Sequence, residues 1–239
     1  MRALVIALLL AFAAPAVAAD YSAAIADSHR PAADTARDAA RKPADMLEFI
    51  GLKPGMKVMD LIPGSGYFTR LFAAAVGPKG HVYAYQPTEF DGFLKDKEPA
   101  VNAVAKEYPN VTVVRASVNA LTVPDKLNVI WTSQNYHDLK NGGGSDTAQV
   151  NKAAFAALKH GGLYIVLDHA AAPGSGARDT NTLHRIDPAT VKAEVMAAGF
   201  VYIGDSAALA NPADDHTKAV FDPAIRGHTD QFVLKFKKP

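Results

Sequence analysis

The stretch KPGMKVMDLIPGSGYFT, residues 53–69, decides the fold of this chain. It contains a short apolar run, residues 56–62, with Lys53-Pro54-Gly55 before it and Pro63-Gly64-Ser65-Gly66 after it. An apolar run of this length between two turns is typical of a strand buried on both faces of a parallel sheet. We expect residues 67–76 to form a helix, so the glycine turn joins a strand to a helix. Its backbone can approach a ligand closely, and the helix offers its first N–H groups.

Strand and helix patterns alternate through the rest of the chain. We expect further strands at residues 81–85, 111–115, 128–132, 163–168, 200–204 and 231–237, and helices at 43–50, 98–107, 146–160 and 188–198. Strands separated by helices indicate βαβ units and a central parallel sheet. No helix separates the last two strands, so they should pair antiparallel at one edge. The predicted fold is an α/β protein with a doubly wound, mostly parallel seven-stranded sheet, an antiparallel edge strand and an N-terminal helical extension.

The composition is that of an ordinary globular protein. The chain has 239 residues, of which 49% are hydrophobic and 21% charged, and it contains no Cys. These values exclude a disordered chain, a collagen-like fibre and a disulfide-stapled scaffold. Lys and Arg total 25 against 24 Asp and Glu, a formal net charge of +1. Because this balance provides no field that attracts phosphates, we expect no nucleic-acid partner.

The N-terminus has the pattern of a secretory signal peptide. Arg2 precedes an unbroken apolar run at residues 3–14, and Ala16-Val17-Ala18 is a small-x-small cleavage site. A retained membrane anchor is the alternative, but residues 3–19 only reach the short limit for a spanning helix. We therefore expect residues 1–18 to be removed on export, without stable membrane insertion afterwards, and the mature protein to be periplasmic. Residues 19–50 then form the helical extension and residues 51–239 the main domain.

Several segments resemble the class I S-adenosylmethionine-dependent methyltransferases, and among them an exported bacterial group known as "predicted methyltransferase". They are residues 53–60, the turn at 63–69, Asn135-Tyr136-His137-Asp138-Leu139, Leu183-His184-Arg185-Ile186-Asp187 and residues 232–239. The resemblance covers the chain from about Arg37 to its end. It implies a Rossmann-like methyltransferase fold and S-adenosylmethionine as cofactor. The leading hypothesis is therefore a methyltransferase that binds S-adenosylmethionine or a related nucleoside and methylates a small molecule.

The cofactor site that the resemblance implies follows the first four strands of the main domain. It comprises Asp60, Pro63, Gly64, Ser65, Gly66, Gln86, Ser117 and Asn135. Three positions depart from the family pattern: Ile62 replaces the first glycine of the loop, Gln86 replaces the acid that binds ribose, and Ser117 replaces the acid that contacts adenine. Gln86 still forms hydrogen bonds, but without the strength of a carboxylate. These departures weaken the predicted cofactor binding. Together with the signal peptide they motivate the alternative to a methyltransferase, an exported non-catalytic ligand-binding protein with a degenerate methyltransferase fold.

Two His-Asp neighbours follow the fourth and fifth strands, where ligands bind in such a sheet. They are His137-Asp138 and Asp168-His169. A His of near-neutral pKa suits a general base, and a carboxylate can orient it. His137, Asp138 and His169 are therefore the candidate catalytic residues, with the turn-capping role of Asp138 as the alternative. We expect the glycine run 142–144 to let this loop close, and His137→Ala to impair ligand binding or turnover with little loss of stability.

The remaining His and Asp residues have structural interpretations. Asp187 fits the N-cap of the helix from residue 188, and Asp214-Asp215-His216 is expected in a solvated loop. No His-x-x-x-His or Cys-x-x-Cys spacing occurs, so no metal site is predicted. The connection at residues 205–230 is long for a compact fold, and long connections are commonly lids or binding loops.

Overall fold

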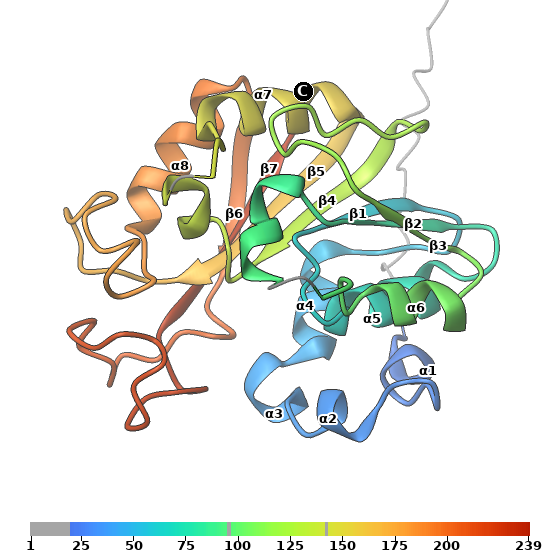
Figure 1. Ribbon diagram of the computed structural model, residues 1–239, viewed down its shortest axis with the longest axis horizontal. Coiled ribbons are helices and arrows are strands. Elements are labelled where there is room, and N and C mark those ends of the chain that lie inside the picture. The colour runs from blue at the N-terminus through green and yellow to red at the C-terminus, as the bar shows by residue number, and fades with distance from the viewer. Residues whose placement is uncertain (1–19, 95–96, 142) are drawn as a thin grey trace, which may run out of the picture.

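The computed structural model describes residues 20–94, 97–141 and 143–239 (Figure 1). The predicted signal peptide, residues 1–18, lies outside the described residues. The strands are β1 (Lys57–Leu61), β2 (His81–Tyr85), β3 (Val111–Val114), β4 (Leu127–Ser133), β5 (Leu158–His169), β6 (Val201–Ser206) and β7 (Gln231–Lys237). The helices are α1 (Ser22–Ile25), α2 (Ala32–Thr35), α3 (Asp38–Arg41), α4 (Pro43–Ile50), α5 (Tyr67–Val76), α6 (Asn102–Glu107), α7 (Thr147–Ala157) and α8 (Pro188–Ala197), with 3₁₀ turns η1 (Thr88–Phe93) and η2 (His137–Lys140).

The strands form one sheet in the order β3-β2-β1-β4-β5-β7-β6. β1 pairs in parallel with β2 and β4, and the parallel pairing continues to β3 on one side and β5 on the other. β7 runs antiparallel to both β5 and β6, as expected for the last two strands. The predicted doubly wound fold is confirmed. Strand order reverses between β1 and β4, so a crevice opens at their carboxyl ends.

Helices cover both faces of the sheet, and the two faces have separate apolar clusters (Figure 1). Because side chains alternate along a strand, Val58 of β1 and Trp131 of β4 pack toward α4, α5 and α6. Met59 of β1 and Ile130 of β4 pack toward α7 and α8. Both clusters are needed because a parallel sheet of this kind has no solvated face.

The segment before β1 consists of short helical turns that are tied to the main domain. Within the predicted helical extension, residues 20–42 form three short helices, α1 to α3. Arg70 of α5 reaches Asp34 of α2 at 3.1 Å, while Arg30 binds Asp38. α4 begins at Pro43 and ends before Gly51, as predicted. Among the described residues no helix has the length and apolarity to cross a bilayer.

The predicted helix at residues 146–160 is wrong in its last turn. α7 ends at Ala157, and β5 begins at Leu158, which pairs with Leu127 of β4. Gly161 and Gly162 therefore lie inside a strand rather than after a helix. Their backbone groups exchange hydrogen bonds with Lys238, which follows β7. This pairing partner is more than seventy residues away, so no local signal identifies it.

Candidate functional site

The turn after β1 has a left-handed backbone at three positions. They are Ile62 (φ 59°), Gly64 (φ 58°) and Gly66 (φ 83°). A Cβ on Gly66 would lie 2.5 Å from Val104, whereas one on Gly64 would meet nothing within 4 Å. Gly66 is thus required for packing against α6, while Gly64 exposes its backbone to open space. Ile62 adopts this conformation although a β-branched residue does so rarely.

A cavity of about 300 Å³ lies at this turn, between the ends of β1 and β4. We call it the turn cavity. Five predicted cofactor residues line it: Asp60, Pro63, Gly64, Ser65 and Asn135. Arg37, Arg41 and Gln134 complete much of its wall. The cavity therefore lies at the switch point of the sheet, where the fold places ligands.

Asp60 is a buried acid on the floor of the turn cavity. Burial raises the pKa of its carboxyl to about 7, although the Thr69 hydroxyl and the positive charge of Arg41 oppose the shift. The Thr69 hydroxyl donates to Asp60 at 2.6 Å. A positively charged ligand in the cavity would favour the ionised form of Asp60.

Arg37 and Arg41 come from the segment before α4, and no sequence pattern marks them as site residues. Arg41 donates a hydrogen bond to the side chain of Gln134, and Arg37 binds Asp34 at 2.6 Å. Burial and the neighbouring Arg37 lower the pKa of Arg41. Only the tertiary fold brings these cations to the β1 turn. Together with Asp60 they give the cavity groups of both signs.

Asn135 bridges the two strands that border the crevice. Its side-chain amide donates to the backbone oxygen of Ile62 at 3.0 Å, and its carbonyl accepts from the Thr132 hydroxyl. It therefore fixes the β1 turn relative to β4 as well as lining the turn cavity.

Three predicted cofactor residues, Gly66, Gln86 and Ser117, do not line the turn cavity. Gln86 is buried at the end of β2, where its backbone N–H donates to Val114. The hydroxyl of Ser117 donates to the carboxylate of Glu89 in η1, and the N–H of Val118 donates to the same carboxylate at 3.0 Å. Glu89 was not identified from the sequence, because it lies 28 residues before the serine that it contacts.

The glycine run near η2 packs against Glu89. A Cβ on Gly143 would lie 2.8 Å from the backbone oxygen of Glu89, and Gly143 has a φ of 71°. Asn119 donates to the backbone oxygen of Gly144 at 2.8 Å. The described part of the run, 143–144, is thus fitted to its neighbours, which explains the glycines without a closing motion; residue 142 lies outside the described residues.

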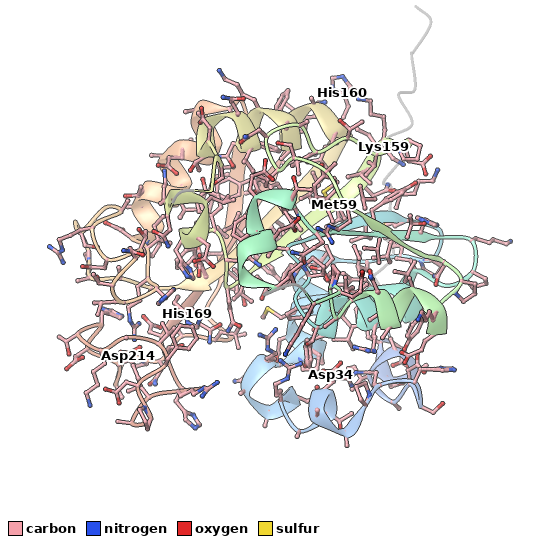
Figure 2. The ribbon with its side chains drawn as sticks, in the orientation of Figure 1. Asp34, Met59, Lys159, His160, His169 and Asp214 are labelled. Carbon is pink, nitrogen blue, oxygen red and sulfur yellow. The ribbon has the colours of Figure 1, made fainter. Side chains whose placement is uncertain are left out.

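A second cavity, of about 290 Å³, adjoins the turn cavity and shares Arg37, Arg41 and Gln134 with it. We call it the loop cavity, because the connection between β6 and β7 supplies much of its wall. Its other lining residues include His169 of β5 with Phe221 and Arg226 of that connection. Figure 2 labels His169 and Asp214 on this side of the molecule. The long connection therefore forms part of a cavity, as its length suggested.

His137 is paired with Asp168 rather than with its sequence neighbour alone. Nδ1 of His137 lies 2.8 Å from one oxygen of Asp168, and both residues are buried. Burial by itself lowers the pKa of His137, but the carboxylates of Asp168 and Asp138 outweigh it and raise the pKa above its ordinary value. The sequence suggested that Asp168 orients His169; the structure assigns that carboxylate to His137.

His169 is a partly buried imidazole at the end of β5. Burial lowers its pKa to about 4, which the nearby Asp168 only partly offsets. Its Nδ1 lies 2.8 Å from the Thr229 hydroxyl, and its backbone N–H donates to Asp168. His169 can therefore hydrogen-bond a ligand in the loop cavity, but it is a weak base.

Asp138 and His184 complete a cluster around His137. Asp138 lies 3.3 Å from Nε2 of His137 and 3.8 Å from Nδ1 of His184. Burial raises the pKa of Asp138. The side chain of Asp138 also accepts a hydrogen bond from the side-chain amide of Asn141 at 3.3 Å. His184 also contacts the exposed ring of Phe221, edge to face.

Two structural interpretations of acids have different outcomes. Asp187 accepts from the N–H of Ala189 at 2.9 Å, so its role as the N-cap of α8 is confirmed. The expectation that Asp214 lies in a solvated loop is wrong. It is buried and forms an ion pair at 2.8 Å with Arg185, whose side chain is also buried. The buried pair anchors the connection between β6 and β7.

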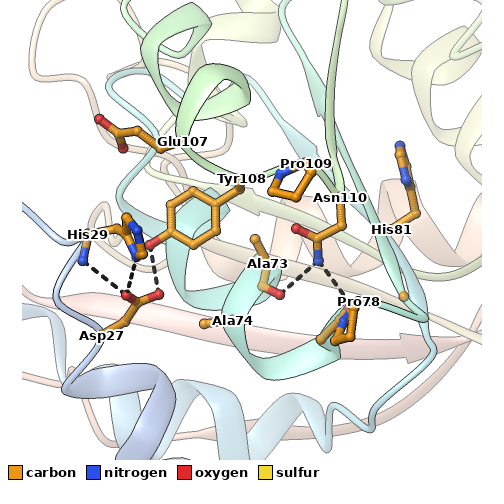
Figure 3. Close-up of a pocket in the computed structure, with 12 residues that line it drawn as sticks. Asp27, His29, Ala73, Ala74, Pro78, His81, Glu107, Tyr108, Pro109 and Asn110 are labelled. Carbon is orange, nitrogen blue, oxygen red and sulfur yellow. Dashed lines mark hydrogen bonds and ion pairs between the residues drawn. The ribbon is translucent and has the colours of Figure 1, made fainter.

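A further cavity, of about 530 Å³, lies near the start of β2 and so away from the candidate site (Figure 3). Its lining includes Asp27, His29, Tyr108 and Asn110. Tyr108 donates to Asp27 at 2.8 Å, and the Asn110 amide donates to backbone oxygens of α5 and the residue after it. The polar groups of Tyr108, Asp27 and Asn110 are thus engaged in hydrogen bonds within the protein, and none of these residues is a predicted site residue.

Sequence comparison finds methyltransferases. Residues 28–116 match the family model for protein-L-isoaspartate(D-aspartate) O-methyltransferase. A ubiquinone/menaquinone biosynthesis C-methyltransferase of Photorhabdus laumondii is 29% identical over 186 residues, covering 74% of this chain and 69% of the relative. The corresponding protein of Shewanella sediminis is 32% identical over 51% of this chain, which spans about half (46%) of that relative.

Solved structures share the fold. A S-adenosylmethionine-dependent methyltransferase from Aquifex aeolicus superimposes with a TM-score of 0.62 at 19% identity, covering 92% of this chain and 99% of the other. A likeness at this identity shows the fold, which is that of the class I S-adenosylmethionine-dependent methyltransferases.

Proposed function

We propose that this protein is a S-adenosylmethionine-dependent methyltransferase that acts on a small-molecule acceptor. The observation that carries the proposal is the turn cavity, where Gly64 exposes its backbone between buried Asp60 and two arginines. The class I methyltransferase fold and the sequence similarity to methyltransferases support the same activity. The cofactor would supply an electrophilic methyl group.

The charges in the turn cavity suit the amino-acid part of that cofactor. Arg37 and Arg41 are donors for a carboxylate, and an arginine can bind it through two hydrogen bonds. Asp60 is an acceptor for an ammonium group. The floor of the cavity thus complements a zwitterion, whereas a simple anion would be repelled by Asp60 once ionised.

The loop cavity is the proposed acceptor site. It shares Arg37, Arg41 and Gln134 with the turn cavity, so ligands in the two cavities lie next to each other. Methyl transfer depends mainly on aligning the acceptor atom with the methyl carbon. His169 can orient the acceptor by a hydrogen bond. Phe221, in the long connection between β6 and β7, offers an apolar contact.

The acceptor is proposed to be a small molecule. The curated relatives are named for C-methylation in quinone biosynthesis. The description of the matched family names a protein substrate, but that match ends at residue 116. Most lining residues of the loop cavity, including His169 and Phe221, lie beyond it. We also propose that the protein is exported, like the bacterial group that it resembles, and such a protein would need a supply of cofactor outside the cytoplasm.

Calorimetric titration with S-adenosylmethionine and with its demethylated product tests the function. We expect saturable binding of both. Arg41→Ala should weaken it by more than about tenfold, because a charge-assisted hydrogen bond is lost. Lys79→Ala removes an exposed cation outside both cavities and serves as the matched control. Absence of heat with both ligands at millimolar concentration would overturn the proposal and favour the non-catalytic binding protein.

A further inference from the structure

His137, Asp138 and His184 point their donor atoms at one another. Nε2 of His137 and Nδ1 of His184 lie 3.3 Å and 3.8 Å from the same oxygen of Asp138. All three donor atoms lie within 4.8 Å of each other. Two neighbouring residues of η2 and one residue 46 positions later are needed to make the cluster, which explains why no short motif indicated it.

Asp168 leaves Nε2 of His137 directed at this cluster. The Asp168 carboxylate takes Nδ1 of the ring, so Nδ1 carries the proton and the lone pair of neutral His137 is on Nε2. That nitrogen is almost fully buried, and it faces a carboxylate oxygen rather than a hydrogen-bond donor. A neutral ring in this tautomer places two lone pairs 3.3 Å apart, and these repel each other unless a proton or a metal ion lies between them.

The separations fit a bound metal ion better than a proton alone. Ligands about 2.0–2.1 Å from a tetrahedral zinc ion are about 3.3 Å apart. The His137–Asp138 distance of 3.3 Å matches this value, and the His184–Asp138 distance of 3.8 Å would have to shorten when an ion binds. A proton on His137 would satisfy Asp138 but gives no role to the third donor, His184. A carboxylate on the outer nitrogen of a metal-binding histidine is also the usual arrangement, and Asp168 supplies it.

The segments that carry the donors are held in place. Arg185, next to His184, is fully buried and donates to the backbone oxygen of Ala170 at 2.9 Å as well as to Asp214. His137 is fixed by Asp168 through its backbone N–H and its ring. Asp138 and His184 are about one quarter and one third exposed, so an ion has a path to the cluster and both can adjust to it.

We propose that His137, Asp138 and His184 bind a divalent transition-metal ion, with Asp168 holding His137 in the ligating tautomer. Two imidazoles and one carboxylate suit Zn²⁺, Fe²⁺ or Co²⁺ rather than Mg²⁺ or Ca²⁺, which prefer oxygen donors. Three protein ligands leave at least one coordination position open. Because His184 contacts Phe221, which lines the loop cavity, a small ligand in that cavity would lie near the open position.

Metal titration of the chelator-treated full chain tests this site without any methyl donor, so its result is independent of the proposed methyltransferase activity. We expect one Zn²⁺ or Co²⁺ ion per chain by calorimetry, d–d absorption bands when Co²⁺ is added, and no competition from excess Mg²⁺. His184→Ala and Asp138→Asn should each weaken binding by more than about tenfold. Circular dichroism checks that both variants are folded.

His29→Ala is the matched control, because His29 also pairs with an aspartate, Asp27, but on an exposed surface outside the cluster. It should bind the ion like the wild type. No stoichiometric binding by the wild type, equal competition from Mg²⁺, or unchanged affinity in folded His184→Ala and Asp138→Asn would each overturn the proposal.

Discussion

Asp168 holds His137 through both of its carboxylate oxygens. One lies 2.8 Å from Nδ1 of the imidazole, and the other accepts from the backbone N–H of His137 at 2.7 Å. The contact joins the end of β5 to the start of η2, and both side chains are almost fully buried. A single acid therefore sets the position and the tautomer of the histidine at the centre of the candidate site.

The burial of this pair changes the expected result of His137→Ala. The substitution leaves the buried Asp168 carboxylate without its ring partner, so it should lower the free energy of unfolding by about 2–4 kcal/mol. Chemical denaturation measures this. His29→Ala, which breaks an exposed pair, should stay within about 0.5 kcal/mol of the wild type. Equal stability of both variants and the wild type would show that the His137–Asp168 contact contributes nothing.

The strained Ile62 reverses the usual order of alanine and glycine. At φ 59°, Ile62→Gly should be more stable than Ile62→Ala by about 1–2 kcal/mol, because only glycine adopts this conformation without cost. Inside a regular helix or strand, by contrast, a glycine makes the protein less stable than an alanine does, by about 0.5–1 kcal/mol. Thermal unfolding of the two variants measures the difference. Gly64→Ala, with open space around its Cβ, isolates the same backbone cost. An alanine variant at position 62 as stable as the glycine variant would contradict the strain.

Asp60 should make the protein less stable as the pH rises. Its pKa is about 7 in the folded chain against 3.8 for an ordinary Asp, so the folded state holds more protons between these values. Its contribution is therefore full below about pH 4 and is lost as the pH rises through about 7, by up to about 4 kcal/mol. Asp60→Asn should match the wild type near pH 4 and exceed its melting temperature at pH 8. If the melting temperatures of Asp60→Asn and the wild type changed with pH in the same way from pH 4 to 8, the raised pKa would be contradicted.

Glu89 should compete with the nucleoside part of the cofactor. The resemblance implies that adenine is contacted at Ser117, and there the Glu89 carboxylate takes the Ser117 hydroxyl and the Val118 N–H. Glu89→Ala should therefore tighten binding of S-adenosylmethionine several-fold, consistent with about 0.5–1.5 kcal/mol for one hydrogen bond. Asp91→Ala alters the same turn at a residue that binds Arg115 instead, and should leave the affinity unchanged. Weaker binding by Glu89→Ala would contradict the competition.

Export predicts a defined mature N-terminus. If residues 1–18 are removed at the Ala16-Val17-Ala18 site, the periplasmic protein should begin at Ala19 or Asp20. Intact-mass measurement of the protein from the periplasmic fraction checks this. The full-length chain in the membrane fraction would instead support the retained anchor.

The sequence by itself determined the architecture. The apolar run before the Gly64-Ser65-Gly66 turn and the alternation of strand and helix patterns predicted a doubly wound sheet, and the paired last strands were also correct. These signals are local, because the side-chain period and the turn residues depend on near neighbours in the chain. They also placed Asp60 and Gly64 at the ligand-binding edge, where both line the turn cavity.

Only the tertiary structure decided which side chains meet there. Arg41 reaches Gln134 across 93 positions, Asp168 takes His137 rather than its neighbour His169, and His184 joins the cluster from a distant loop. Such contacts depend on where the crossover connections place the ends of the strands, and the hydrophobic periodicity of the sequence does not predict them. Burial acts in the same way: the raised pKa of Asp60 arises from the removal of water around it, which is a property of the packed molecule and not of its residue order.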